Sequence, residues 1–203
     1  MTNHHPIDVL LFDLGGVLID FAGFEEMGPL LSKPVPRPVV RQRWIESEAV
    51  RLFERGEIAP MEFADRSLAE WDLAMDADAF LDLFVGWARG LYPGAAQLLG
   101  RIRTEFPLAC LSNSNELHTP LHREAIGPFI ERCFFSNEIG SVKPEVEIFH
   151  HVVRELAIDP SRIGFFDDTA INVEAAERAG LTAYLTDGIV ELEDQLARLG
   201  VLD

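Results

Sequence analysis

The chain has 203 residues, 48% of them hydrophobic, and carries a formal net charge of −17. This length suits one domain, or one domain with an insert, and the apolar fraction is enough to bury a sizeable core. The acidic balance argues against nucleic acid or a membrane surface as a partner. The N-terminus lacks the basic region of a signal peptide, and no apolar run is long enough to span a bilayer, so a cytoplasmic protein is expected.

The first predicted element is a buried strand over residues 7–12, which leads through Asp13 into a turn containing Gly15 and Gly16. In open α/β sheets, ligands bind at the carboxyl ends of the strands, where this carboxylate would lie. Glycine also lets a ligand or a metal ion approach the backbone closely. An isolated Asp at a strand end is usually a surface residue, so the role of Asp13 depends on the rest of the chain.

Residues 21–91 contain no strand-like run before a glycine turn, and their apolar residues recur at helical spacing. A proline-rich break around Pro34 and a stop at Gly56 divide this region. The pattern predicts about four helices, which are expected over 24–31, over 38–55, from Pro60 onward and over 77–88.

Strand and helix patterns alternate after the turn at Tyr92-Pro93-Gly94. The predicted strands are 107–111, 132–136, 162–166 and 181–185, and the predicted helices are 95–104, 116–126, 145–157, 170–179 and 189–200. Such alternation is typical of a parallel sheet with crossover helices. The expected fold is therefore an α/β Rossmann-like core flanked by helices, formed by residues 1–20 and 92–203, with an inserted α-helical cap over 21–91.

Polar residues follow three of the later strands, as Asp13 follows the first. They are Ser112 and Asn113 after the second core strand, Lys143 after the third, and Asp167 and Asp168 after the fourth. Parallel strands would gather these groups at one edge of the sheet. A carboxylate, a hydroxyl, an ammonium and a pair of carboxylates suit phosphoryl transfer to an aspartate with a magnesium ion.

In their type and order these four motifs resemble those of the haloacid dehalogenase superfamily of aspartate-nucleophile hydrolases, over nearly the whole chain. Three segments are similar to a subgroup of small sugar-phosphate phosphatases that includes α-D-glucose-1-phosphate phosphatase. They are Phe53-Glu54-Arg55-Gly56-Glu57-Ile58, Leu111-Ser112-Asn113-Ser114-Asn115-Glu116-Leu117-His118 and Phe165-Phe166-Asp167-Asp168. The resemblance implies that the helical insert is a cap that closes over the site.

The resemblance also implies a nucleophile and a metal site. Asp13 would attack phosphorus to form an aspartyl-phosphate, which water then hydrolyses. Mg²⁺ would be held by Asp13, Asp168 and the carbonyl of Gly15, and would offset the repulsion between carboxylate and phosphate. Asp167 would support this site from behind, because two adjacent acids of a strand cannot point the same way.

The remaining implied roles concern the phosphate group. Lys143 would clamp the charges of the phosphate and of Asp13. Pro144 suits the first position of the next helix, which would place Lys143 at a helix N-terminus that favours anions. Ser112 and Asn113 would hydrogen-bond phosphate oxygens, although a plain Ser/Asn turn is the alternative.

Residues outside the four motifs are expected to be structural. His118 and His122 lie four apart on a helix but have no apparent third ligand, so they are interpreted as solvated or capping residues. Trp44, Trp71 and Trp87 are expected to pack inside the cap rather than against a substrate.

One position departs from the resemblance. The phosphatases usually carry a second Asp two residues after the nucleophile, as general acid and base, and here that residue is Gly15. Such a group is typically worth about a hundred- to ten-thousand-fold in rate. Three interpretations stay open, namely a phosphatase that manages with water or Asp20, a metal-independent 2-haloacid dehalogenase, and a non-catalytic protein that binds a phosphorylated ligand or partner.

The favoured interpretation is a Mg²⁺-dependent phosphatase acting on a small phosphate monoester, such as a sugar phosphate. Its expected partner is then a small phosphorylated metabolite. Either a monomer or a homodimer is compatible with the sequence.

Overall fold

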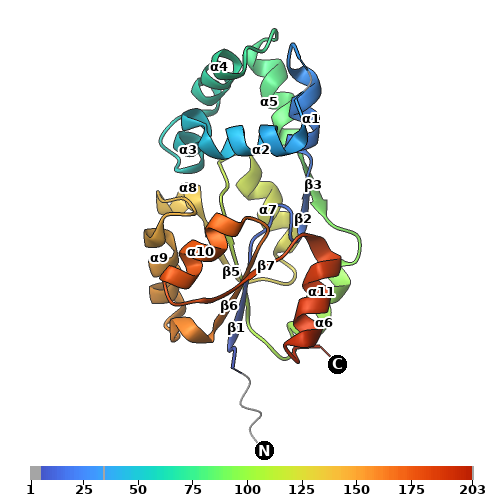
Figure 1. The fold of residues 1–203 in the computed structure, drawn as a ribbon, viewed down its shortest axis with the longest axis vertical. Coiled ribbons are helices and arrows are strands. Elements are labelled where there is room, and N and C mark those ends of the chain that lie inside the picture. The colour runs from blue at the N-terminus through green and yellow to red at the C-terminus, as the bar shows by residue number, and fades with distance from the viewer. Residues whose placement is uncertain (1–5, 34, 203) are drawn as a thin grey trace, which may run out of the picture.

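The fold of the computed structural model, which describes residues 6–33 and 35–202, is built on one parallel sheet (Figure 1). The predicted segment 1–20 and the predicted break at Pro34 each extend into residues outside this range. The sheet has the order β5-β4-β1-β6-β7. Its strands are β1 (Val9–Phe12), β4 (Leu108–Ser112), β5 (Arg132–Phe135), β6 (Ile163–Asp167) and β7 (Thr182–Leu185). The α/β, Rossmann-like fold expected from the sequence is confirmed.

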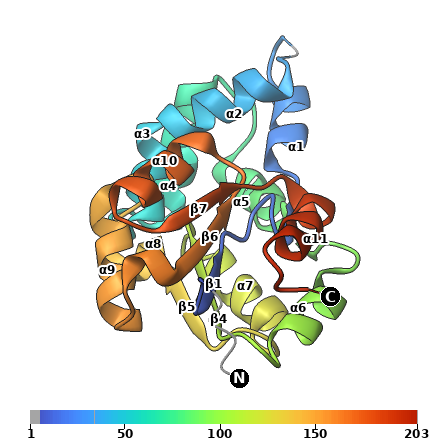
Figure 2. The ribbon, with the colours of Figure 1, turned by 60° about the horizontal axis from the view of Figure 1, so that its bottom comes forward.

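Alternate residues of the central strands pack on opposite faces of the sheet, as strand geometry requires. Leu10 and Phe12 of β1 contact one layer of helices, and Val9 and Leu11 contact the other. Figure 2 shows the two layers on either side of the sheet. The first consists of α6 (Ala95–Ile102), α7 (His118–Ile126) and α11 (Gly188–Arg198), and the second of α9 (Val146–Leu156) and α10 (Ala170–Arg178).

The order of the strands brings three chain segments to one edge of the sheet. β1 pairs in parallel with β4 on one side and with β6 on the other, so the sheet changes its winding direction at β1. The backbone N–H of Asp13 donates to the carbonyl of Phe166 at 2.8 Å, which continues the pairing past the end of β1. Ligands of doubly wound sheets bind at such a switch point.

The segment between β1 and β4 in the chain is largely helical and lies above the sheet in Figure 1. The chain enters and leaves this segment through an antiparallel pair of strands, β2 (Ile19–Phe21) and β3 (Ala88–Leu91), which was not predicted. Its helices are α1 (Gly23–Leu30), α2 (Arg37–Glu46), α3 (Glu48–Glu54), α4 (Pro60–Trp71) and α5 (Ala77–Gly86). Here it is called the helical segment.

One helix predicted in this segment proved wrong. The structure interrupts residues 38–55 at Ser47, whose backbone is extended and whose hydroxyl accepts a hydrogen bond from the N–H of Val50 at 3.2 Å. Serine in this role begins a new helix, because it satisfies an N–H that has no partner within the helix. The described part of the helical segment therefore has five helices rather than about four.

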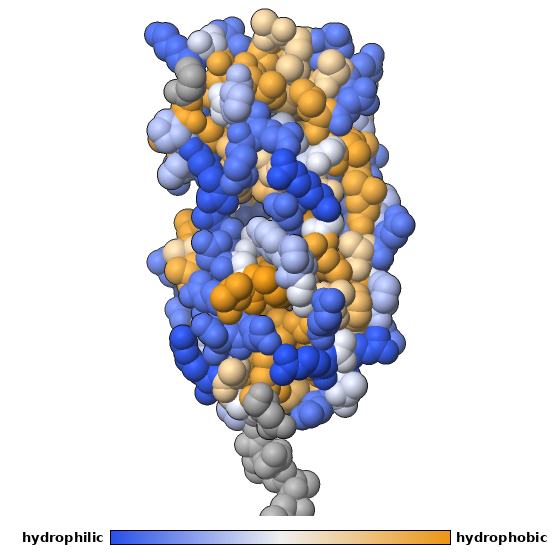
Figure 3. Space-filling model, turned by 90° about the vertical axis from the view of Figure 1, so that its right-hand side faces the viewer, coloured by the Kyte–Doolittle hydropathy of each residue, from blue (hydrophilic) through white to orange (hydrophobic). Residues whose placement is uncertain are grey.

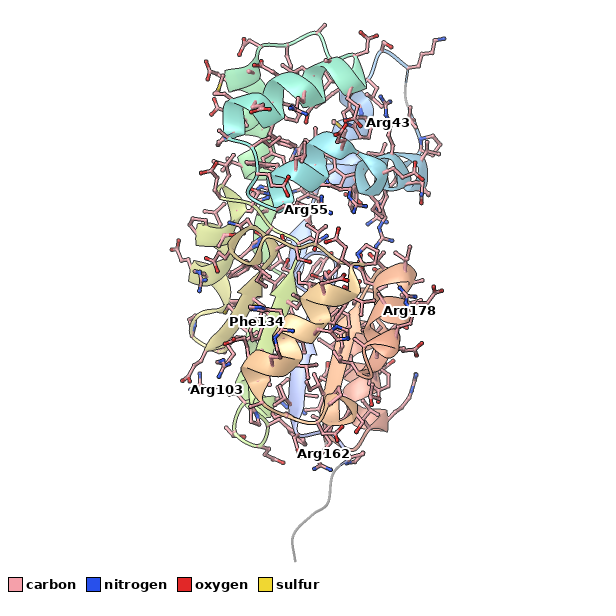
Figure 4. All side chains as sticks on the ribbon, turned by 90° about the vertical axis from the view of Figure 1, so that its left-hand side faces the viewer. Arg43, Arg55, Arg103, Phe134, Arg162 and Arg178 are labelled. Carbon is pink, nitrogen blue, oxygen red and sulfur yellow. The ribbon has the colours of Figure 1, made fainter. Side chains whose placement is uncertain are left out.

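Aromatic side chains form the core of the helical segment. Trp44, Trp71 and Trp87 are buried there among four phenylalanines, and the rings of Phe53 and Phe63 stack at 4.3 Å. Arg43, labelled in Figure 4, covers the outer face of Trp71 with its guanidinium carbon 4.2 Å from the ring centre. The prediction that the tryptophans serve packing is confirmed, although Trp44 also borders the cavity described below.

Contacts with the sheet layer hold the helical segment in place. Arg51 and Arg55 both form ion pairs with Glu145, which precedes α9, and Figure 4 shows Arg55 at this junction. The ring Nε2–H of His118 donates to the carbonyl of Phe84 at the end of α5, at 2.8 Å. His118 also stacks on the ring of Phe84, with 4.3 Å between their centres.

Both histidines of α7 are buried, so the expectation that they are solvated or capping residues was wrong. His118 is bound on both ring nitrogens, because Asn115 lies 3.3 Å from its Nδ1, and His122 Nδ1 lies 3.3 Å from the hydroxyl of Ser114. Burial lowers the pKa of His118 to about 4 and that of His122 to about 3. Both rings are therefore neutral at physiological pH.

No helix in the described ranges combines the length and the apolar character required to cross a bilayer.

The buried histidines predict loss of stability in acid. His118 takes up a proton more readily in the unfolded chain, where its pKa is about 6.5, than in the folded chain, where it is about 4. The free energy of unfolding should therefore be highest above pH 6.5 and fall as the pH is lowered toward 4, by roughly 3 kcal/mol for this group.

Urea unfolding across this pH range measures the effect. The His118→Gln variant should show a shallower pH dependence than the wild type, because the titrating group is gone. The His150→Gln variant is the control, because His150 is exposed, and it should keep the wild-type slope. Equal slopes for the wild type and the His118 variant would contradict this account.

Candidate active site

A cavity of about 150 Å³ lies between the edge of the sheet and the helical segment. Its floor includes the residues that follow the strands, and its roof consists of apolar and charged residues of α2, α3 and α5. The predicted site residues on its wall are Asp13, Gly15, Ser112, Asn113, Lys143 and Asp168, whereas Asp167 lies behind it. The face in Figure 3 is hollowed where the helical segment meets the sheet layer, with hydrophilic side chains around the hollow.

Lys143 occupies the centre of the site. Its ammonium lies 2.8 Å from a carboxylate oxygen of Asp13 and 2.6 Å from one of Asp167. It also donates to the carbonyl of Leu111 at 3.2 Å, so a side chain that is almost fully buried has three oxygen partners. Charge-assisted contacts of this kind are what make a buried ammonium tolerable.

The expected position of Lys143 at a helix N-terminus was wrong. The helix α9 begins only at Val146, with Glu145 as the residue before it. The side chain of Asn113 fixes the backbone of Lys143 instead. Its oxygen accepts from the N–H of Lys143 at 2.8 Å, and its amide donates to the carbonyl of Lys143 at 3.1 Å.

The two adjacent acids of the fourth motif have different surroundings. Asp167 is fully buried and accepts hydrogen bonds from the N–H of Thr169 at 2.8 Å and from the amide of Asn172 at 3.0 and 3.1 Å, besides its contact with Lys143. Asp168 borders the cavity. Because both oxygens of Asp167 already have partners, it is placed to orient Lys143 rather than to bind a ligand.

Carboxylate oxygens of Asp13, Asp167 and Asp168 lie within 4.8 Å of one another. With Asp167 occupied, Asp13 and Asp168 are the two that open on the cavity, and Gly15 is beside them. One or two carboxylates with room for phosphate and water is the donor set that Mg²⁺ takes. These residues therefore fit the predicted ion.

Burial sets the ionisation of the cluster. It raises the pKa of Asp13; Lys143 acts against this effect, whereas the nearby Asp167 and Asp168 reinforce it. Burial alone would lower the pKa of Lys143, but Asp13 and Asp167 hold it above its ordinary value, so the ammonium stays charged. Burial also raises the pKa of Asp168, against the effect of the Arg41 guanidinium.

Arg41, Arg51 and Glu54 are charged residues of the helical segment that line this site, and none was predicted to do so. Arg41 of α2 lies 2.8 Å from a carboxylate oxygen of Asp168 and donates to the hydroxyl of Thr169 at 2.8 Å. Glu54 of α3 lines the cavity, and the nearby Asn113 side chain lowers the pKa of its carboxyl. Nothing near Arg41 in the sequence indicates this position, whereas Glu54 belongs to the Phe53–Ile58 segment that carries the subgroup resemblance.

The two glycines after Asp13 have different constraints. Gly16 has φ +79°, and a Cβ there would lie 2.3 Å from a carboxylate oxygen of Asp168. A Cβ at Gly15 would meet only the Cβ of Phe21, at 3.7 Å, which is an ordinary contact. Gly16 is therefore required for Asp168 to approach the turn, whereas Gly15 has room for a side chain.

Comparison with known proteins identifies the family. The model of the haloacid dehalogenase-like hydrolases matches residues 7–180, and the chain belongs to this family. It is therefore an enzyme of the hydrolase class.

Particular relatives extend this comparison. A phosphatase of Mycobacterium tuberculosis is 24% identical, over 95% of this chain and 93% of its own length. A phosphoglycolate phosphatase of Pseudomonas putida is 26% identical over 85% of this chain, and the match spans 66% of that protein. A haloacid dehalogenase family enzyme of Bacteroides thetaiotaomicron, solved with magnesium and inorganic phosphate, is 25% identical, with a TM-score of 0.69 over 89% of this chain and 94% of the other.

The turn after Asp13 yields a prediction about stability. Gly16→Ala should lower the free energy of unfolding by more than about 1 kcal/mol, because it combines a positive φ with displacement of Asp168. Gly15→Ala is the matched control and should leave the stability close to that of the wild type. Urea unfolding of the three proteins is the measurement, and equal losses in both variants would refute the assigned difference.

Lys143 yields a second prediction. Lys143→Met should destabilise the fold by about 3–5 kcal/mol at neutral pH, because it leaves the carboxylates of Asp13 and Asp167 buried without a cation. The loss should shrink in acid, because burial raises the pKa of Asp13 and its carboxyl is then protonated. Lys33→Met changes the other lysine of the chain, which is exposed, and should be neutral. Equal stability of the two variants in urea unfolding would show that Lys143 is not needed to balance this cluster.

Proposed function

We propose that this hydrolase is a Mg²⁺-dependent phosphatase, which cleaves a small phosphate monoester through an aspartyl-phosphate on Asp13. The observation that carries the proposal is the position of this carboxylate on the cavity floor, 2.8 Å from the ammonium of Lys143 and beside Asp168. A nucleophilic carboxylate with a cation beside it can approach a phosphate dianion without prohibitive repulsion. The phosphatase names of the relatives support the same reaction class.

The proposed roles of the floor residues follow from their contacts. Asp13 attacks phosphorus, and Lys143 neutralises charge on both Asp13 and the phosphate. Asp13, Asp168 and the carbonyl of Gly15 would hold Mg²⁺, which when bound supplies positive charge against the phosphate oxygens. Ser112 hydrogen-bonds a phosphate oxygen, since it lines the cavity and its hydroxyl has only a long 3.3 Å contact to the carbonyl of Asn113.

Asn113 contributes differently from the sequence-based expectation. Its side-chain oxygen and amide are both engaged with the backbone of Lys143. In the proposed mechanism its side chain therefore positions Lys143, and its backbone N–H is left for a phosphate oxygen.

We propose the two-domain division predicted from the sequence, with the core in residues 1–20 and 92–203 and the cap in 21–91. The cavity supports it, because its floor comes from the core and its roof from the helical segment. Its volume of about 150 Å³ is close to that of a cavity that holds benzene. A small ester fits this space, and a sugar 1-phosphate of the kind hydrolysed by the resembled subgroup would need the cap to move outward.

Experiment distinguishes the proposed phosphatase from two alternatives, a dehalogenase and a non-catalytic binding protein. A 2-haloacid dehalogenase would use Asp13 on carbon and would not need the carboxylate of Asp168, which sits where an ion would bind. A non-catalytic phospho-ligand protein would bind esters without turnover.

The proposal is tested with a panel of small phosphate esters, a sugar 1-phosphate and a short haloacid, with Mg²⁺ and with chelator. Wild-type protein should release phosphate only with Mg²⁺, and Asp13→Asn should lose turnover while keeping its fold by circular dichroism. Asp8→Asn, which changes the residue just before β1 and away from the cavity, is the control and should keep activity. Phosphatase activity that survives chelation or the Asp13 substitution would overturn the mechanism.

A further inference from the structure

Glu54 is a carboxyl group in the active-site cavity that none of the roles above uses. It is the last residue of α3 and comes from the helical segment, whereas the other cavity carboxyls, Asp13 and Asp168, follow strands of the sheet. Among the described residues that line the cavity, these three are the carboxyl groups. Asp13 is the proposed nucleophile, and both Asp13 and Asp168 are proposed metal ligands. Glu54 is therefore the carboxyl group among these three that has no assigned role.

The structure holds Glu54 in place from the sheet side. The hydroxyl of Ser136, at the end of β5, donates to the backbone carbonyl of Glu54 at 2.6 Å and accepts from the N–H of Ser114 at 2.9 Å. Two residues further on, Gly56 has φ +72°, and a Cβ there would lie 2.8 Å from the carbonyl oxygen of Asn137. The backbone around Glu54 is therefore in close contact with the loops that build the floor.

The surroundings of the Glu54 side chain also come from the floor. The side chain of Asn113, whose amide donates to the carbonyl of Lys143 at 3.1 Å, acts on the Glu54 carboxyl and lowers its pKa. The ion pairs of Arg51 and Arg55 with Glu145 hold α3 on either side of Glu54 in the chain. Glu54 therefore lines the same cavity as Asp13 and is close to the residue that positions Lys143.

Its surroundings keep Glu54 protonated at neutral pH. Burial raises its pKa to about 8; Lys143 lowers it, Asp13 raises it and Arg51 lowers it. Arg41 and Asp168 face it across the cavity, and they pair with each other at 2.8 Å. General acids work best with a pKa near the operating pH.

Neither Gly15, at the usual position of the general acid, nor Asp20 supplies a proton donor to the cavity. Gly15 has no side chain. Asp20 is partly exposed on β2, lies 3.9 Å from the guanidinium of Arg89 and does not line the cavity. Glu54 is therefore the candidate that the geometry supplies.

We propose that Glu54 is the general acid and base of this site, an inference that rests on the phosphatase activity proposed above. In the first step a carboxylate oxygen of Asp13 bonds to phosphorus, the bond to the ester oxygen breaks, and that oxygen keeps the electron pair and takes the proton of Glu54 to leave as an alcohol.

In the second step a water molecule gives one proton to the Glu54 carboxylate and its oxygen bonds to phosphorus. The bond from phosphorus to Asp13 breaks, and its electron pair restores the carboxylate. Inorganic phosphate leaves with the second proton of the water, and Glu54 is protonated for the next cycle.

The experiment compares Glu54→Gln with Glu57→Gln, which makes the same change at an exposed position three residues on. Each is assayed on an alkyl phosphate and on para-nitrophenyl phosphate, whose leaving group needs no proton. Glu54→Gln should lose about 10²- to 10⁴-fold in kcat on the alkyl ester. On the activated ester its first turnover should stay fast and be followed by slow steady state, which appears as a burst of nitrophenol.

The pH profile supplies an independent readout. Wild-type activity on the alkyl ester should fall as the pH rises through about 8, because Glu54 then loses its proton, and Glu54→Gln should lack this alkaline limb. Glu54→Asp should recover part of the lost rate, and Glu57→Gln should match the wild type throughout.

Each contrary outcome has one meaning. Equal losses on both esters without a burst would show a structural role and overturn the assignment. Unchanged activity in Glu54→Gln, with turnover still abolished in Asp13→Asn, would overturn Glu54 as the acid and leave the phosphatase proposal standing. No turnover of any ester by the wild type would overturn both.

Discussion

The site depends on the contacts between the ammonium of Lys143 and the carboxylates beside it. It lies between the carboxylates of Asp13 and Asp167, at 2.8 and 2.6 Å, in a place from which water is almost excluded. Without that cation, two buried carboxylates at the same edge of the sheet would repel one another, and their charges would be uncompensated. Asn113 binds the backbone of Lys143, and Asn172 binds Asp167. These contacts hold the ammonium and the carboxylates in position.

The helical segment supplies the part of the site that does not come from the sheet. Its aromatic core packs its helices together, and the ion pairs of Arg51 and Arg55 with Glu145 attach the segment beside the floor. Three charged residues of this segment, Arg41, Arg51 and Glu54, line the roof of the cavity beside apolar side chains. The proposed nucleophile on the sheet layer and the proposed proton donor on the helical segment would couple catalysis to closure, because the site is complete only when the two parts meet.

Much of the fold and of the floor could be predicted, because strand ends are a local signal. Asp13, Ser112 and Asp167 each follow a short apolar run, and parallel pairing brings such residues to one edge. The break at Ser47 was missed because the apolar spacing continues across it, although Ser is a common residue at a helix start. The burial of His118 was missed because its partner, Phe84, is distant in the sequence. Arg41 and Glu54 reach the site only through tertiary packing, which periodicity cannot reveal.

The stereochemical course at phosphorus tests the central claim most directly. A phosphorothioate monoester made chiral with oxygen isotopes is hydrolysed in water carrying a third isotope, and the configuration of the released thiophosphate is determined. Transfer to Asp13 followed by transfer to water consists of two in-line displacements, so the account predicts retention of configuration. Inversion would mean that water attacks the ester directly, and it would contradict an aspartyl-phosphate on Asp13.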